Sequence, residues 1–334
     1  MNSMSTLDGS TLFWGLGMGV IVLVLTLLLM PSLIQALHRL KFGQTEREEG
    51  LESHKKKTGT PTMGGIAFVF IPLVVYALFS LFSPFKWSFM ATFLWAAYVG
   101  FGLIGLADDY LIIIRHTNDG LPPKVKLGLQ ILLGGLLSFV YMKTQGTTIY
   151  LPGPTLWIVP EILFFILGLL VYAGSTNAVN FSDGVDGLCA GLCAIAFAPF
   201  MAISIWENSF DGAAIAFMII CALLGYLRFN YHPAKVFMGD TGSLALGGVF
   251  AAFGMVTHFE LLLIILGLVF VVEALSVIIQ VSVYKKTHKR VFRMAPIHHH
   301  FEKKGWSEKK VCFVFWSWGA LFALISLALA WMSL

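Results

Sequence analysis

Long and nearly uncharged apolar runs recur along the chain, and they restrict what it can fold into. A helix that crosses a bilayer needs about 20 mostly apolar residues. Of the 334 residues, 57% are hydrophobic and only 12% are charged, whereas soluble domains carry about 25% charged residues. We therefore expect an all-α, polytopic membrane protein with a single domain over residues 1–334. The runs predict about ten transmembrane helices, at residues 12–30, 65–82, 89–106, 127–142, 157–173, 188–205, 212–227, 243–258, 261–283 and 312–332.

The positive charges lie almost entirely on one side of the predicted spans. All 22 lysines and arginines except Lys86 and Lys143 fall in loops 31–64, 107–126, 228–242 and 284–311. Because cytoplasmic loops are enriched in Lys and Arg, we expect these loops inside and both termini outside. The outer loops are short apart from residues 143–156, where β-branched residues and a Pro-Gly-Pro turn predict a small external hairpin.

Acidic residues gather at the predicted cytoplasmic ends of the spans. They occur in "GLADDY", "NAVNFSDGVDG" and "FMGDTGS", whose polar positions include Asp108, Asp109, Asn177, Asn180, Asp183, Asp186 and Asp240. Each motif alone also fits a turn, a solvated helix end or an N-cap. Together with nearby lysines they favour Mg²⁺ and phosphate, because Mg²⁺ takes carboxylate and phosphate oxygens. We expect Asp240 to bind the metal, and the helix that starts at Thr241–Ser243 to offer N–H groups to an anion.

Glu273 and a run of three histidines are unusual for where they occur. Glu273 lies inside the ninth predicted span, where a carboxyl group is a functional candidate by default, although we favour a buried structural hydrogen bond. His298, His299 and His300 occur in the basic loop "VFRMAPIHHHFEKKGW", which is too internal for a tag. Three adjacent side chains cannot all point one way, so we do not expect one metal to bind all three. An active-site role and a solvated loop both stay open.

Five motifs taken together resemble one family of membrane enzymes. They are "GTPTMGG" (59–65), "ADDY", "NAVNFSDGVDGL", "PAKVFMGDTGS" (233–243) and "MAPIHHHFE" (294–302). Over nearly its whole length, the chain resembles the polyprenyl-phosphate N-acetylhexosamine-1-phosphate transferases. The resemblance implies Mg²⁺-dependent transfer of phospho-MurNAc-pentapeptide from UDP-MurNAc-pentapeptide to undecaprenyl phosphate, which gives lipid I and UMP in peptidoglycan biosynthesis. It also implies a homodimer in the bacterial inner membrane, with a cytoplasmic active site and no nucleic-acid partner.

The same resemblance implies roles for particular residues. Catalytic roles fall to Asp108, Asp109, Asp240 and His299, and Asp240 is the implied metal ligand. Substrate binding falls to Lys57, Lys124, Asn177, Asn180, Asp183, Asp186, Asn230, Phe237, His298 and His300. The chain departs from the family at Ile112, where some relatives carry a lysine. Lys124 or Arg115 would then have to supply the cation near Asp109.

Other functions and routes fit parts of the pattern. A related transferase that moves GlcNAc-1-phosphate would share the acidic motifs, but "APIHHHFE" favours the muramoyl-pentapeptide branch. A secondary transporter would place polar residues near the middle of the membrane, often in repeats, whereas these carboxylates cluster at one interface. For the transferase, a one-step attack by the lipid phosphate and a phospho-enzyme formed on an aspartate both stay open.

Overall fold

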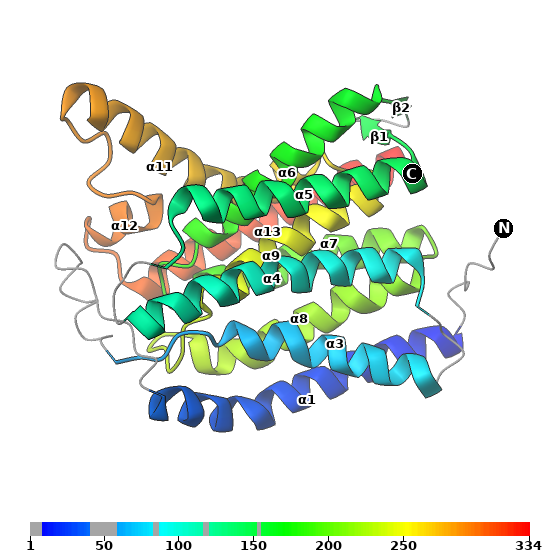
Figure 1. Cartoon of the computed structure of the whole chain (residues 1–334), viewed down its shortest axis with the longest axis horizontal. Coiled ribbons are helices and arrows are strands. Elements are labelled where there is room, and N and C mark those ends of the chain that lie inside the picture. Colours follow the sequence, from blue (N-terminus) through cyan, green and yellow to red (C-terminus); the bar gives the residue numbers. More distant parts are fainter. Residues whose placement is uncertain (1–8, 41–58, 83–86, 116–119, 152–154) are drawn as a thin grey trace.

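Ten long helices dominate the structure. The computed structural model describes residues 9–40, 59–82, 87–115, 120–151 and 155–334. The ten helices are each long and apolar enough to cross a membrane, which confirms the predicted all-α, polytopic fold. Most of them lie side by side (Figure 1). They are α1 (Gly9–Arg39), α3 (Gly65–Phe82), α4 (Phe89–Arg115), α5 (Pro123–Gln145), α6 (Glu161–Phe181), α7 (Leu188–Trp206), α8 (Phe210–Asn230), α9 (Gly239–Val256), α11 (Leu268–Thr287) and α13 (Glu308–Ser333).

Helix α9 lies at the centre of the bundle. Of its residues, 89% are buried, whereas only 22% of the residues are buried in the most apolar stretches of α1 and α11. Small residues let the backbones of neighbouring membrane helices approach closely. A Cβ on Gly105 of α4 would overlap the carbonyl oxygen of Asp240, and a Cβ on Gly247 would overlap the backbone of Thr176 in α6. The glycines therefore bring α4 and α6 directly against α9.

The acidic motifs and the histidine triplet lie at one end of the bundle, as the charge pattern predicts. Asn180 of α6 donates a hydrogen bond to Asp240 of α9, and the ring of His298 lies against Gly184. The start of α1, the C-terminus and the β-strands lie at the opposite end (Figure 1). The acidic end is therefore the end that the charge pattern predicts to face the cytoplasm.

The predicted hairpin exists, but it lies slightly further along the chain than residues 143–156. Strand β1 (Thr148–Leu151) pairs antiparallel with β2 (Thr155–Ile158), and Thr148 lies opposite Ile158. The shift arises because α5 continues to Gln145 and is followed by Gly146, whose φ of +92° suits glycine. His258, after α9, fixes the hairpin: its carbonyl oxygen accepts a 2.7 Å hydrogen bond from the Tyr150 N–H.

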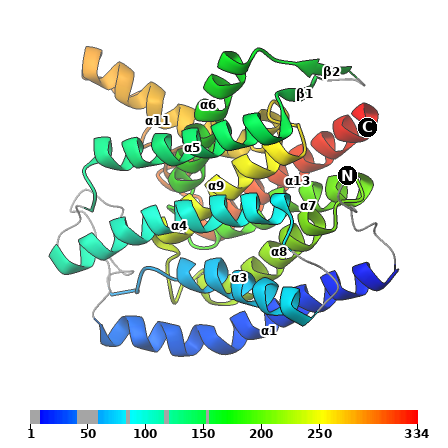
Figure 2. The same ribbon diagram turned by 45° about the vertical axis from the view of Figure 1, so that its right-hand side comes forward.

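The ninth span differs from the prediction of one continuous helix over residues 261–283. A short helix α10 (Leu263–Leu266) ends at Gly267, and the long helix α11 begins at Leu268. The backbone of Gly267 is not helical, at φ −93° and ψ 17°, and glycine is a poor helix former. From this break, α11 leans away from the other spans (Figures 1 and 2). Its lipid-facing surface is correspondingly large.

Replacing Gly105 with alanine should destabilise the protein, because the added Cβ would overlap the backbone of α9. Overpacking of this kind costs about 1–3 kcal/mol, which thermal unfolding of the full chain in detergent would record as a lower Tm. Gly128 of α5 is the matched control, since a Cβ there meets no atom within 4 Å. Gly128→Ala should leave Tm unchanged or raise it. Equal effects of the two substitutions would contradict the close approach of α4 and α9.

Candidate active site

Asp240, in the first turn of α9, lies at the centre of a polar cluster. Its carboxylate contacts the ammonium group of Lys126 from α5. The Nδ2 group of Asn180 donates to Asp240 Oδ1 at 2.8 Å and lies 2.8 Å from Ser243 Oγ. The Lys126 Nζ also lies 3.7 Å from Asp108 Oδ1. The predicted residues Asp108, Asn180 and Asp240 therefore meet, and the positive charge of Lys126 lies between two carboxylates.

Asp109 fixes the start of α9. Its Oδ1 accepts a 3.1 Å hydrogen bond from the Asp240 N–H, and its Oδ2 accepts from the Thr241 N–H at 2.9 Å and the Thr241 hydroxyl at 2.6 Å. Helix starts leave such N–H groups without partners inside the helix, and a carboxylate there stabilises the helix. Gly239, at φ +69°, is required because a Cβ would overlap Asp109. Asp109, on α4, thus acts as the cap of α9.

This cap changes the expected role of the helix start. The sequence predicts that the N–H groups at Thr241–Ser243 face an anion, but the N–H of Thr241 already donates to Asp109. The carboxylate of Asp109 therefore takes the place that a phosphate would occupy at that N–H. Asp109 has a positioning role in this structure, while Asp240 presents its carboxylate to Lys126.

Asp108 is buried beside Asp109, because α4 continues well beyond residue 106, the predicted end of the span. Its Oδ1 accepts a 3.0 Å hydrogen bond from the Leu121 N–H. Asp108, Asp109 and Asp240 each offer a carboxylate oxygen, and these atoms lie within 4.8 Å of one another. Such an all-oxygen donor set suits a hard cation such as Mg²⁺. Asp109 already accepts three hydrogen bonds. The other two carboxylates, Asp108 and Asp240, therefore have more capacity for a metal.

The lysine beside the carboxylates is Lys126, whereas the resemblance implies Lys124. Both residues lie in the first turn of α5, but two residues apart on a helix face nearly opposite directions. Lys124 is exposed, and Lys126 is partly buried against Asp240. Arg115 donates to the Gly120 carbonyl oxygen at 3.1 Å instead of contacting the carboxylates. Sequence spacing separates the two lysines but does not tell which one faces α9. Lys57 lies outside the described residues.

A second cluster joins the loop after α6 to the start of α13. Asp186 is buried, and its Oδ2 lies 3.0 Å from His232 Nδ1 and accepts a 2.9 Å hydrogen bond from the Ala234 N–H. Glu308 Oε2 lies 3.6 Å from the same ring nitrogen and accepts from the Asp186 N–H at 3.3 Å. Asp186 therefore holds two loops together. His232 and Glu308 are absent from the sequence prediction because neither lies in an acidic motif.

Asn230 connects this second cluster to the segment "GTPTMGG" (59–65). Its Oδ1 accepts from the Gly187 N–H at 3.1 Å, and its Nδ2 donates to the Val236 carbonyl oxygen at 2.9 Å. Phe237 follows Val236 in the chain. Its N–H donates to the Pro61 carbonyl oxygen, and its carbonyl oxygen accepts from the Gly64 N–H, each at 2.8 Å. The Phe237 side chain is partly exposed. The loops that carry the predicted nucleotide-binding residues thus form one connected surface.

Asn177 and Asp183 lie on either side of Asn180. Asn177 Nδ2 donates to Gln130 Oε1 of α5 at 2.6 Å. It therefore joins α5 to α6, and none of its hydrogen bonds reaches Asp240. Asp183 is partly exposed in the turn that follows α6. Asn180, between them in sequence, donates the hydrogen bond to the Asp240 carboxylate.

The three histidines occupy the short helix α12 (Ile297–Glu302) and face different partners. His298 Nδ1 lies 3.1 Å from Glu273 Oε1, and His299 Nδ1 lies 2.6 Å from Glu302 Oε2. His300 Nδ1 instead accepts a 3.1 Å hydrogen bond from the Arg293 N–H. Desolvation, with the positive charges of Lys304 and Arg293, lowers the pKa of His300. The Nδ1 atoms of the three rings therefore have three different partners.

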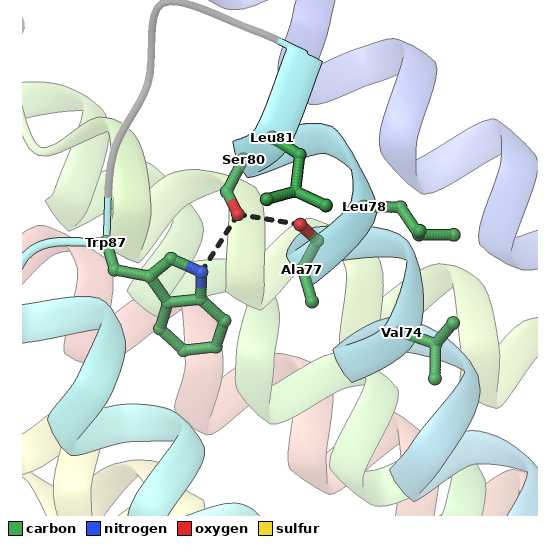
Figure 3. A pocket seen from close by; sticks show the side chains of 6 residues that line it. All are labelled: Val74, Ala77, Leu78, Ser80, Leu81 and Trp87. Carbon is green, nitrogen blue, oxygen red and sulfur yellow. Dashed lines mark hydrogen bonds between the residues drawn. The ribbon is translucent and has the colours of Figure 1, made fainter.

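An apolar groove lies at the far end of α3, away from the carboxylates. Its walls are Val74, Ala77, Leu78, Ser80, Leu81 and Trp87 (Figure 3). The polar atoms drawn there bond to one another, since Trp87 Nε1 donates to Ser80 Oγ at 2.9 Å and Ser80 donates to the Ala77 carbonyl oxygen at 2.7 Å. Among the described residues that line the groove, none is an acid or a base. It is therefore unsuited to phosphate chemistry, and the acidic end remains the candidate site.

Comparisons with known proteins define the class of this site. Residues 90–258 match glycosyl transferase family 4, which makes the chain a membrane member of that class. Residues 57–69 match signature 1 of the phospho-N-acetylmuramoyl-pentapeptide-transferases. Three relatives carry that name. This chain is 44% identical to the one from Geobacillus sp. (strain WCH70), 45% identical to the one from Staphylococcus haemolyticus and 46% identical to the one from Oceanobacillus iheyensis. These alignments cover 92–93% of this chain and 94–97% of each relative. The chain belongs to the phospho-N-acetylmuramoyl-pentapeptide-transferase family, which confirms the resemblance.

Asp109 and Asp240 should respond differently to replacement by asparagine. In Asp109→Asn, one of the two acceptor oxygens becomes an NH₂ group, so an N–H at the start of α9 loses its acceptor, and leaving a buried donor without a partner costs about 1–3 kcal/mol. Asp240→Asn leaves the cap in place, so its Tm should fall less while its turnover falls more steeply. Thermal unfolding and turnover of both variants in detergent test the division of roles. A larger loss of Tm in Asp240→Asn would contradict the capping role of Asp109.

Proposed function

We propose that the protein transfers phospho-MurNAc-pentapeptide from UDP-MurNAc-pentapeptide to undecaprenyl phosphate, forming lipid I and releasing UMP. Membership of the family supports this proposal. The single structural observation that carries it is the cluster of Asp108, Asp240 and Lys126 at the charged end of a membrane-spanning bundle. Such a cluster can bring a soluble nucleotide and a membrane-bound phosphate together.

We propose Mg²⁺ as the cofactor, held by Asp240 with Asp108. The all-oxygen donor set supports this choice, since Mg²⁺ favours carboxylates together with phosphate oxygens. Bound there, Mg²⁺ would withdraw negative charge from the pyrophosphate oxygens. Lys126, which contacts Asp240 in this structure, would then turn its ammonium group towards the substrate phosphates. Asp109 would keep the first turn of α9 in register with Asp108.

The residues of the chain mainly position and neutralise the reacting phosphates. In the one-step route, an oxygen of the lipid phosphate bonds to the β-phosphorus, and the bond from that phosphorus to the UMP oxygen breaks. Phosphomonoesters lose their second proton near pH 6, so Asp108 has more to do as an orienting group than as a base. Lys126 offsets the charge on the phosphates. Phosphoryl transfer needs little more than such positioning and charge stabilisation.

The competing phospho-enzyme route would begin with attack by an aspartate on the β-phosphorus. Asp108 and Asp240 are the candidates, because Asp109 is engaged by its three hydrogen bonds. The two routes differ in one measurable respect. Stoichiometric UMP release from the nucleotide in a single turnover, without any lipid phosphate, would exclude the one-step route.

We further propose that the protein works as a homodimer, each chain a single domain, in the bacterial inner membrane. Ten candidate spans and bacterial relatives support the location. The positive-inside pattern supports a cytoplasmic site with Lys86 and Lys143 on the outer face. Light scattering of the detergent-solubilised protein would report the mass of the assembly, and a monomer would contradict the dimer.

The proposed activity can be tested by UMP release from the purified full chain in detergent. We expect release only when UDP-MurNAc-pentapeptide, undecaprenyl phosphate and Mg²⁺ are all present. UDP-GlcNAc should not replace the donor, and turnover with it instead would favour the alternative GlcNAc-1-phosphate transferase. No UMP release with either donor would exclude both transferase functions.

Lys126→Met should lower kcat by about 100-fold, the usual cost of removing one group that stabilises developing charge. Lys143→Met is the matched control, because Lys143 lies on the same helix at the opposite end, paired with Glu161 at 2.6 Å. Its turnover should match the wild type. Comparing Lys124→Met in the same assay shows which lysine of α5 serves the site. Wild-type turnover in Lys126→Met would contradict the role given to Lys126.

A further inference from the structure

Two neighbouring imidazole rings of α12 face the loop after α6 in the same way. A Cβ on Gly184 would overlap Nε2 of His298 and would come within 3.2 Å of Nε2 of His299. The two rings lie edge to face, with centroids 4.1 Å apart. Each ring also has a carboxyl group at its Nδ1, from Glu273 at 3.1 Å and from Glu302 at 2.6 Å. Both rings thus direct Nε2 to Gly184, between Asp183 and Asp186.

The partner of His298 comes from a different part of the fold. Glu302 belongs to α12 itself, whereas Glu273 belongs to α11, the span that leans away from the bundle (Figure 2). Glu273 and His298 are both fully buried, at 0% exposure. Glu273 Oε2 also lies 3.5 Å from the His298 backbone N–H. One carboxyl group therefore contacts the histidine through both its ring and its backbone.

The two ring nitrogens of His298 have different neighbours. Among the described residues neither nitrogen has a hydrogen-bond partner, but Nδ1 lies within ion-pair range of Glu273 Oε1, at 3.1 Å, whereas Nε2 faces the loop at Gly184. A buried polar atom without a partner costs about 1–3 kcal/mol, so its persistence calls for an explanation. The carboxyl group at Nδ1 favours the tautomer in which Nδ1 carries the proton, which leaves Nε2 as an acceptor. A donor group of a bound substrate would satisfy that nitrogen.

We propose that Glu273 is a positioning residue that acts through His298 on the nucleotide donor. It fixes the ring so that Nε2 meets the donor at the Asp183–Asp186 turn, and it ties the placement of α11 to that end of the site. This inference rests on the proposed transferase function. It explains a carboxyl group inside a predicted span, where an acid without a role is expensive.

A purely structural role for Glu273 predicts a different outcome from a positioning role. If Glu273 only secured α11 to the bundle, its loss would lower Tm without a specific effect on the nucleotide donor. If it acts through His298, the loss should fall on the nucleotide donor. The effect of replacing Glu273 should also disappear when His298 has already been replaced, because Glu273 then has no ring to position.

A double-mutant cycle separates the two roles, using Glu273→Ala, His298→Ala and the double variant of the full chain. We expect Glu273→Ala to lower kcat/KM for UDP-MurNAc-pentapeptide by about 100-fold, as small misplacements of reacting groups do. The KM for undecaprenyl phosphate should stay unchanged. The double variant should be no worse than His298→Ala alone. Multiplicative losses in the double variant, or a loss confined to the acceptor KM, would overturn the proposal.

Two further variants guard against loss of folding. Glu273→Gln keeps an acceptor oxygen and nearly the same volume, so it should keep more activity than Glu273→Ala, and it replaces alanine in the cycle if that variant fails to fold. Equal activity of the two variants would also overturn the proposal. Glu260→Gln is the matched control: Glu260 is buried, at 2% exposure, but its neighbour Phe259 stacks on Tyr150 of the hairpin, at the end of the bundle opposite the site. It should turn over like the wild type. A wild-type protein that releases no UMP would refute the proposed function instead.

Discussion

The hydrogen bonds between Asp109 and the first turn of α9 are the interaction on which the site depends. They join the inner end of α4 to the start of the most buried helix. The glycines at 105 and 239 allow this contact, since larger residues would separate the two helices or overlap the carboxylate. Once α9 is fixed, the side chain of Asp240 can only project towards Asn180 and Lys126. The position of the Asp240 carboxylate thus depends on hydrogen bonds that a neighbouring acid accepts.

The spans and the shared side of the acidic motifs could be predicted because both depend on local sequence. Hydropathy over some 20 residues identifies a membrane helix, and lysine-rich loops give its orientation. Lys126 could not be chosen over Lys124 because the choice depends on which face of α5 packs inward. The contacts of His232 and Glu308 with Asp186 join segments distant in sequence. The break at Gly267 was missed because a single glycine in an apolar run does not always end a helix.

The site combines residues on two long, closely packed helices with residues on one short helix. The carboxylates lie on α4 and α9, whose backbones touch. The histidines lie on the short helix α12, which reaches the bundle through α11 and the Glu273–His298 contact. The chemistry of phosphoryl transfer tolerates little misplacement of charge, so carboxylates belong on rigid elements.

The burial of α9 also bears on how such a chain can change during evolution. A helix that is 89% buried, and glycine-rich where it meets α4, α3 and α6, has almost no position free to accept a larger side chain. Helix α1 faces lipid over most of its surface, and there any apolar residue satisfies the membrane. Sequence drift should therefore be uneven, slow along the central helix and fast along the lipid-facing ones. The span with the lowest mean hydropathy, α9 at 1.2, would change most slowly, and the span with the highest, α1 at 2.5, would be among the fastest.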